Sequence, residues 1–121
     1  MGYTEKAYQL YSDWLVGNED VYDWCYADMG YILMTKGDWE NSIDLLEKAD
    51  KINNADFYTK KYLSFYYFFR EDFLEAGNYE YQFRYRKNTY EEIKWKESKN
   101  EFLEGFKNDW QFQKLLQVTL G

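Results

Sequence analysis

The chain has 121 residues, of which 15 are basic and 22 are acidic, and its formal net charge is -7. This length suits one domain with a single hydrophobic core. With one cysteine and no histidine, the chain lacks an intramolecular disulfide and the usual zinc and iron ligand sets. The negative charge disfavours direct contact with nucleic acid or an anionic membrane surface, and no apolar segment approaches the roughly 20 residues that span a bilayer. We therefore expect a cytoplasmic protein without a metal or cofactor.

Helices are the secondary structure that the sequence predicts throughout. Proline is absent, strand-like alternation of apolar and polar residues is never sustained, and apolar residues recur at steps of three and four. Ile43, Leu46, Ala49 and Ile52, for example, form one stripe along a helix. The pattern predicts an all-α fold with helices at about 3–16, 20–36, 39–52, 57–70, 73–87, 90–104 and 108–118.

Residues typical of helix ends support these boundaries. Gly17, Gly37 and Gly105 each follow a helical pattern, at points where a left-handed C-terminal cap favours a residue without Cβ. Asp38, Asp56 and Thr89 precede helical patterns, where an aspartate or threonine side chain can accept a bond from a free backbone N–H. Glu92, three residues after Thr89, completes a capping box. These signals predict three helix ends and three helix starts.

An internal repeat links the central helices. Helix pairs of similar length joined by short turns are what a repeat array produces, and the sequence matches itself at an offset of 34 residues. The matched positions are Met29-Gly30 with Leu63-Ser64, Leu33 with Tyr67, Asp38-Trp39 with Asp72-Phe73, Ser42 with Ala76, and Asn54 with Asn88.

The stretch from Met29 to Asn54 resembles the tetratricopeptide repeat family, whose unit is a pair of antiparallel helices with small residues at their crossing. The residues that carry the resemblance are Met29-Gly30, the turn Gly37-Asp38-Trp39, and then Ser42, Leu46 and Ala49. The resemblance implies antiparallel helix pairs stacked as a short α-solenoid in a single domain, 1–121. It divides the chain into an N-terminal capping helix (1–19), a first repeat (23–56), a second repeat (57–90) and degenerate C-terminal helices (91–121).

The second unit departs from this pattern at three positions. Lys60 breaks the pattern, Glu71 stands where a turn glycine is expected, and Phe83 stands where a small residue is expected. Because helix axes about 8–10 Å apart leave little room for two large side chains at one crossing, Phe83 predicts looser or altered packing of the second pair.

Catalytic chemistry finds little support in the sequence. The cluster of Glu19, Asp20 and Asp23 lacks the alternating ligand spacing of a calcium loop, and we interpret it as a solvated helix start. Cys25 has no histidine to activate it and lies near the carboxylates of Asp23 and Asp28, which raise a thiol pKa. We therefore expect Cys25 to be a packing residue and predict no catalytic residues and no enzyme activity.

The most unusual stretch is 62–73, in which seven of twelve residues are aromatic. A helix with apolar residues on more than one face is buried on both sides or covered by a ligand. Two interpretations remain open: the C-terminal helices fold back over these rings, or the rings line a groove for a partner. In tetratricopeptide proteins the first helix of each unit lines such a groove, and the resemblance implies these partner-binding residues: Trp24, Tyr31, Tyr58, Lys61, Tyr62, Phe65 and Phe69.

We therefore expect a protein-interaction module, an adaptor or scaffold that binds a peptide or helix of a partner protein through an aromatic groove. Lys61 would meet an acidic group of that ligand. The alternative is an acidic inhibitor of the kind that phages use to block a nucleic-acid enzyme of the host. Because two good units are fewer than the roughly three that usually give a stable array, we also expect a homodimer.

Overall fold

The computed structural model describes Lys6, Gln9 and residues 23–53, 56–85 and 99–120. The all-α prediction is confirmed for this part of the chain, which contains no strand. The helices are α2 (Asp23–Thr35), α3 (Trp39–Ile52), α4 (Phe57–Phe69), α5 (Phe73–Tyr85), α6 (Lys99–Gly105) and α7 (Trp110–Leu120). The predicted helix 3–16 lies outside the described residues except for Lys6 and Gln9, which are helical, and residues 90–98 of another predicted helix also lie outside them. No helix within the described ranges has the length and apolar character needed to cross a bilayer.

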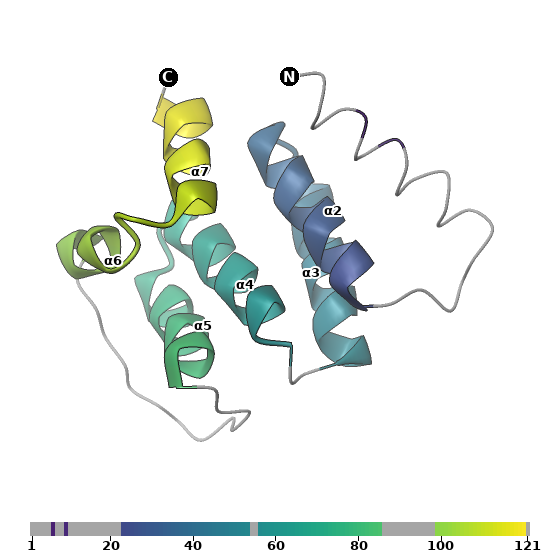
Figure 1. Cartoon of the computed structure of the whole chain (residues 1–121), viewed down its shortest axis with the longest axis horizontal. Helices are drawn as coiled ribbons and strands as arrows, with labels where there is room; N and C mark the ends of the chain where they lie inside the picture. The colour runs from purple at the N-terminus through teal and green to yellow at the C-terminus, as the bar shows by residue number, and fades with distance from the viewer. Residues whose placement is uncertain (1–5, 7–8, 10–22, 54–55, 86–98, 121) are drawn as a thin grey trace.

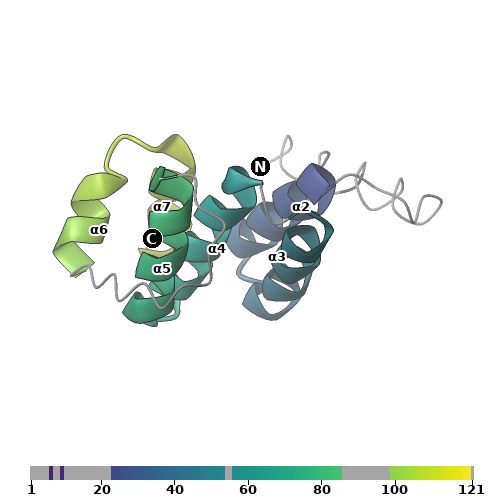
Figure 2. The same cartoon turned by 90° about the horizontal axis from the view of Figure 1, so that it is seen from below.

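The helices form two consecutive pairs that stack on each other. Helix α2 packs along α3, and α4 packs along α5 (Figure 1). The pairs meet through α4, which contacts both α2 and α3. Figure 2 shows the resulting row, with α6 at one end and the α2–α3 pair at the other. This arrangement agrees with the predicted stacking of antiparallel helix pairs.

The turns inside the two pairs have the same hydrogen bonds. In the first turn the Asp38 N–H donates to the Leu33 carbonyl at 2.9 Å, and the Asp38 carboxylate accepts from the Asn41 N–H at 3.2 Å. In the second turn the Asp72 N–H donates to the Tyr67 carbonyl, also at 2.9 Å, and its carboxylate caps α5 in the same way. Each aspartate thus closes one helix and opens the next, so the 34-residue offset is present in the backbone.

Gly30 lies at a close contact between α2 and α3. A Cβ atom added at Gly30 would lie 2.7 Å from both Cγ and Cδ2 of Leu46. The Ser42 hydroxyl donates to the Gly30 carbonyl at 2.6 Å and ties the two helices together. In the second pair, Ser64 and Ala76 are fully buried at the equivalent positions. The predicted small residues at both crossings therefore serve helix packing.

Gly105 does not have the role that the sequence predicted. It is the last residue of α6, and its backbone is outside the left-handed region that Gly37 occupies. Its small size instead leaves room for α5, since a Cβ atom there would lie 2.8 Å from Nη2 of Arg84. Arg84 in turn pairs with the fully buried Glu80.

The buried lysine at position 60 explains one departure from the repeat pattern. Lys60 is 1% exposed, and its Nζ lies 2.5 Å from Oδ1 of Asp50. The Tyr79 ring lies 5.7 Å from the same ammonium group. Because an unpaired buried charge is very costly, the Asp50 carboxylate on α3 is what lets α4 place a lysine against the first pair.

A cluster of phenylalanine rings forms the core of the C-terminal half. Helices α6 and α7 bring Phe102, Phe106 and Phe112, all nearly fully buried, against α4. Phe68 of α4 stacks on Phe102 with ring centroids 4.4 Å apart. Phe83, which stands where the repeat pattern has a small residue, is half-buried, and its ring stacks on Phe106 at 6.3 Å. The looser or altered packing expected of the second pair stays a prediction. Cys25 is fully buried within the same continuous core, as expected for a packing residue.

Candidate interaction groove between helices α2 and α4

The seven residues predicted to bind a partner all lie on the two helices that line the expected groove. Trp24 and Tyr31 are on α2, and the other five are on α4. Their exposure divides them into three groups. Tyr31, Lys61, Tyr62 and Phe65 are between 0% and 8% exposed, and Phe69 is half-buried. Trp24 and Tyr58 remain 47% and 66% exposed.

The chain's own C-terminal helices cover the buried group. The Phe65 ring lies 4.9 Å from Phe106 and 5.1 Å from Phe112, measured between centroids. Phe69 also contacts Phe112, at 5.6 Å. Of the two interpretations of the aromatic stretch, the structure therefore shows the first at these rings, because α6 and α7 fold back over them. Large apolar surfaces are rarely left uncovered in monomers.

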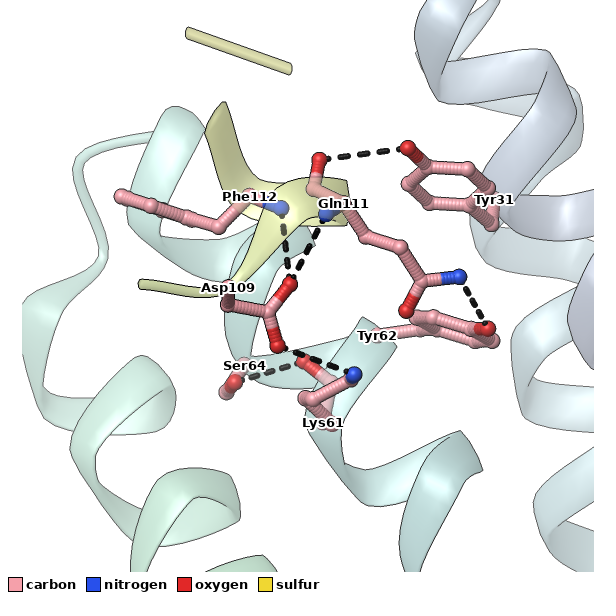
Figure 3. Close-up of polar contacts among 7 residues, drawn as sticks. All are labelled: Tyr31, Lys61, Tyr62, Ser64, Asp109, Gln111 and Phe112. Carbon is pink, nitrogen blue, oxygen red and sulfur yellow. Dashed lines mark hydrogen bonds and ion pairs between the residues drawn. The ribbon is translucent and has the colours of Figure 1, made fainter. Parts of the chain in front are cut away.

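Asp109 fixes the start of α7 over the groove (Figure 3). Its Oδ1 accepts hydrogen bonds from the N–H groups of Gln111, at 2.9 Å, and Phe112, at 3.0 Å. Its Oδ2 accepts from Nζ of Lys61 at 3.0 Å. The carboxylate is thus both the N-cap of α7 and the partner of a buried lysine on α4. Lys61 meets an acidic group, as the sequence predicted, but this group belongs to the same chain.

Two tyrosines connect α2, α4 and α7 in the same network. The Tyr31 hydroxyl donates to the Gln111 carbonyl at 3.2 Å, and the Gln111 side-chain amide donates to the Tyr62 hydroxyl at 2.8 Å. The two tyrosine rings stack with centroids 5.3 Å apart. Burial raises the pKa of both phenols well above its usual value near 10, and the Asp109 carboxylate raises it further. Both phenols are therefore neutral hydrogen-bonding groups at neutral pH.

Four aromatic rings lie close to the Lys61 ammonium group. Its Nζ lies 5.5 Å from the Tyr58 centroid, 5.7 Å from Tyr62 and 5.8 Å from Phe65 and Phe83. At these distances the negative faces of the rings attract a cation. The Ser64 hydroxyl donates to the Lys61 carbonyl at 2.6 Å and braces the same turn of α4. Lys61 therefore belongs to the interior and is not offered to a ligand.

Within the described ranges, one end of the groove is left uncovered, at the N-terminal ends of α2 and α4. A pocket of about 230 Å³ lies there between the two helices, and we call it the Trp24–Tyr58 pocket. Its described lining residues are Trp24, Ala27, Asp28, Asp56, Tyr58 and Tyr62. Trp24 and Tyr58 are the two predicted groove residues that stay exposed, so the structure brings them together in this pocket.

Sequence reasoning missed the two carboxylates of this pocket. Asp56 was expected only as a helix cap, and it does cap α4, since it accepts from the Tyr58 N–H and the Thr59 hydroxyl, each at 3.0 Å. Asp28 is half-buried on α2, four residues after Trp24 and therefore on the same helix face. That spacing is a signal that could have placed Asp28 beside the predicted groove.

Comparison of the chain with protein families, with curated proteins and with solved structures found no match. The fold thus defines the class, an all-α protein of stacked helix pairs, and the site adds an aromatic groove that the C-terminal helices close except at one end.

Proposed function

We propose that this chain is a protein-interaction module, an adaptor that binds a peptide or helix of a partner protein at the open end of the groove between α2 and α4. The observation that carries the proposal is the exposure of Trp24 and Tyr58 beside a pocket in an otherwise closed aromatic groove. Tryptophan and tyrosine dominate interface hot spots because they combine a large contact area with a polar tip and few rotamers.

The way in which α7 lies in the groove supports this proposal. The buried part of the groove already holds a helix, fixed by stacked rings and by the Lys61–Asp109 pair. Helix-in-groove binding uses the same combination of apolar anchors and a few directional polar contacts. A partner segment that follows the groove next to α7 would also meet Trp110, whose ring is 73% exposed and packs edge-on against Tyr31 at 6.4 Å.

The resemblance of 29–54 to tetratricopeptide repeats points in the same direction, because members of that family bind partner proteins. We also propose that the chain belongs to this family and that it acts in the cytoplasm. The alternative, an acidic inhibitor of a nucleic-acid enzyme, has less support. A surface that blocks such an enzyme needs its carboxylates gathered together without basic residues among them. On α3 the exposed Glu40, Asp44 and Glu47 share the surface with the exposed Lys48 and Lys51.

The test compares protein capture by the parent chain and by a Trp24→Ala, Tyr58→Ala double variant, in extracts of the native cell. Tyr85→Ala is the matched control, because Tyr85 is an exposed aromatic residue (50%) at the C-terminal end of α5 and is not among the described residues that line the pocket. We expect at least one protein that the parent and the control both retain and the double variant loses. Isothermal titration with that purified protein should then show a loss of affinity of about tenfold or more, as hot-spot truncations cause.

Equal capture by all three chains would contradict the proposal, and so would equal loss in the double variant and the Tyr85 control. The retained protein can also be a second copy of this chain. Light scattering at tens of micromolar then gives a mass above 14.9 kDa for the parent and a smaller mass for the double variant. That result would identify the expected homodimer as the occupant of the open end.

A further inference from the structure

The chemistry of the Trp24–Tyr58 pocket suits a positively charged group. Its described lining includes two exposed aromatic residues, Trp24 and Tyr58, the buried Tyr62, and two aspartates, Asp28 and Asp56. None of the described lining residues is basic. Aromatic faces attract cations, and carboxylates accept charge-assisted hydrogen bonds. This is the opposite of the acidic ligand that the sequence predicted from Lys61.

Lys61 does not cancel this preference. Its ammonium group lies 3.0 Å from the Asp109 carboxylate, which balances its charge, and its side chain is 9% exposed. The negative groups of the pocket lie on α2 and at the N-terminal cap of α4. The net charge of the whole chain, -7, adds a field that draws a basic partner toward the surface.

We infer that the Trp24–Tyr58 pocket binds an arginine side chain of the partner protein. A guanidinium group is planar, stacks on aromatic rings and carries five hydrogen-bond donors in a fixed plane. Asp56 has acceptor sites left for it, since a carboxylate offers about four and two of them serve Tyr58 and Thr59. A pocket of about 230 Å³ fits the head of one side chain, whereas sites for drug-sized ligands usually begin near 300 Å³.

Arginine suits these walls better than the other biological cations. A quaternary ammonium group has no N–H to donate, so it would leave the remaining acceptor sites of Asp56 unused. A lysine ammonium donates to carboxylates but lacks the flat surface that stacks on an indole. The inference rests on the proposed function only for the source of the arginine, because the chemistry of the pocket stands independently.

The test is a titration of the full ¹⁵N-labelled chain with N-acetyl-arginine amide, followed through the indole N–H signal of Trp24. A Trp24→Phe variant assigns that signal. The comparison ligand is N-acetyl-citrulline amide, which has nearly the same shape without the charge. We expect the arginine compound to shift the Trp24 signal with a dissociation constant in the millimolar range, and the citrulline compound to bind at least about fivefold more weakly.

Two single variants locate the effect. Asp28→Asn keeps the shape of the pocket and removes one charge, so it should weaken arginine binding by about threefold or more. Asp44→Asn removes one charge from the exposed face of α3 and should change the affinity by less than half of that. The inference is overturned by an unmoved Trp24 signal, by equal binding of arginine and citrulline, by equal effects of the two variants, or by tighter binding of tetramethylammonium than of arginine.

The two proposals fail in different ways. If the arginine compound does not bind while capture of the partner still depends on Trp24 and Tyr58, the arginine inference is wrong and the interaction module stands. If the compound binds but capture is unchanged in the double variant, the pocket is an arginine site and the proposed function is wrong.

Discussion

Glu71 and Gly37 occupy the same left-handed turn in the two helix pairs, 34 residues apart, with φ angles of 63° and 81°. In both turns the residue in this conformation donates its N–H to a carbonyl three residues earlier, and the next residue donates to one five residues earlier. The glycine is expected there, because its missing Cβ removes the steric penalty of positive φ. The glutamate adopts the same backbone conformation, but its Cβ makes that conformation less favourable.

Glu71→Gly should therefore stabilise the protein by about 1 kcal/mol, which is the order of the penalty that a non-glycine residue carries in this region. Glu71 is exposed, so the substitution removes no buried contact. Urea unfolding followed by circular dichroism would measure the change. Gly37→Glu is the matched control and should destabilise by a similar amount; a loss of stability in Glu71→Gly would contradict the shared turn.

Local signals in the sequence were sufficient for the two central pairs. The bounds predicted for α3, 39–52, are those of the structure, and the Gly37 and Asp38 signals mark the turn before it. The close crossing at Gly30 also followed from the sequence, because a repeat of 34 residues places small residues at fixed positions. These features depend on neighbours within a turn or within one helix pair.

The closing of the groove could not be predicted in the same way. The contact between Lys61 and Asp109 joins residues 48 positions apart, and no local pattern identifies Asp109, among the many acidic residues of the chain, as the partner of Lys61. The sequence therefore indicated that Lys61 needs an acidic partner and that the rings of 62–73 need cover, but not that α7 supplies both. Covering these rings removes a large apolar area from water, which is why the chain's own helix lies there.

Gly30→Leu should overfill the crossing of α2 and α3 and destabilise the protein by roughly 1–3 kcal/mol, the range found for overpacked cores. The reason is the 2.7 Å approach of Leu46 to the position of an added Cβ. Thermal and urea unfolding measure the effect. Gly30→Ala gives a sharper test when it is combined with Leu46→Ala: the second substitution should cost less in the Gly30→Ala chain than in the parent, because it relieves the overlap. Additive effects would place Gly30 away from the crossing.

Phe65 and Tyr58 lie two turns apart on α4 and should respond very differently to truncation. Phe65 is fully buried among Phe106 and Phe112, so Phe65→Ala should cost about 3–5 kcal/mol. Tyr58 is 66% exposed, and Tyr58→Ala should change the free energy of unfolding by less than about 0.5 kcal/mol. Chemical denaturation of the two variants decides the matter. If both variants lost similarly little free energy of unfolding, Phe65 would not be part of the core and would line the open groove instead.

Alkaline pH should unfold the protein in a way that depends on Tyr62. Burial raises the pKa of this phenol in the folded chain above the value near 10 of an unfolded chain. Below pH 10 the phenol is neutral in both states; above it, the unfolded chain releases the proton first, so stability falls as the pH rises. The slope for one such group is at most about 1.4 kcal/mol per pH unit.

A Tyr62→Phe variant tests this dependence. At pH 7 it should be less stable by about 1 kcal/mol, since it loses the hydrogen bond from Gln111. Between pH 10 and 12, however, its stability should fall less steeply than that of the parent, because it has no buried phenol at this position to ionise. Urea midpoints measured across pH 7–12 give both slopes, and parallel curves would show that Tyr62 is not a buried neutral group in the folded chain.

The last prediction separates the two roles of Asp109. Its Oδ1 caps α7 by accepting from two backbone N–H groups, and its Oδ2 holds the charge of the buried Lys61. Asp109→Asn keeps an acceptor for the cap but leaves Lys61 without a negative partner, so it should destabilise by roughly 2–4 kcal/mol. Asp109→Ala should cost about 1 kcal/mol more, because the cap is lost as well.

A second substitution shows whether the charge is the cause. Lys61→Met removes the buried cation and fills its space with an apolar side chain of similar length, so most of the loss in Asp109→Asn should be recovered when the two are combined. The same substitution should recover little of the loss in Asp109→Ala that is due to the cap. Guanidinium unfolding of the parent, Asp109→Asn, Lys61→Met and their double variant gives the coupling energy between the two side chains. A coupling near zero would mean that the Lys61–Asp109 contact does not hold α7 in the groove, and the closing of the groove would then rest on the phenylalanine rings alone.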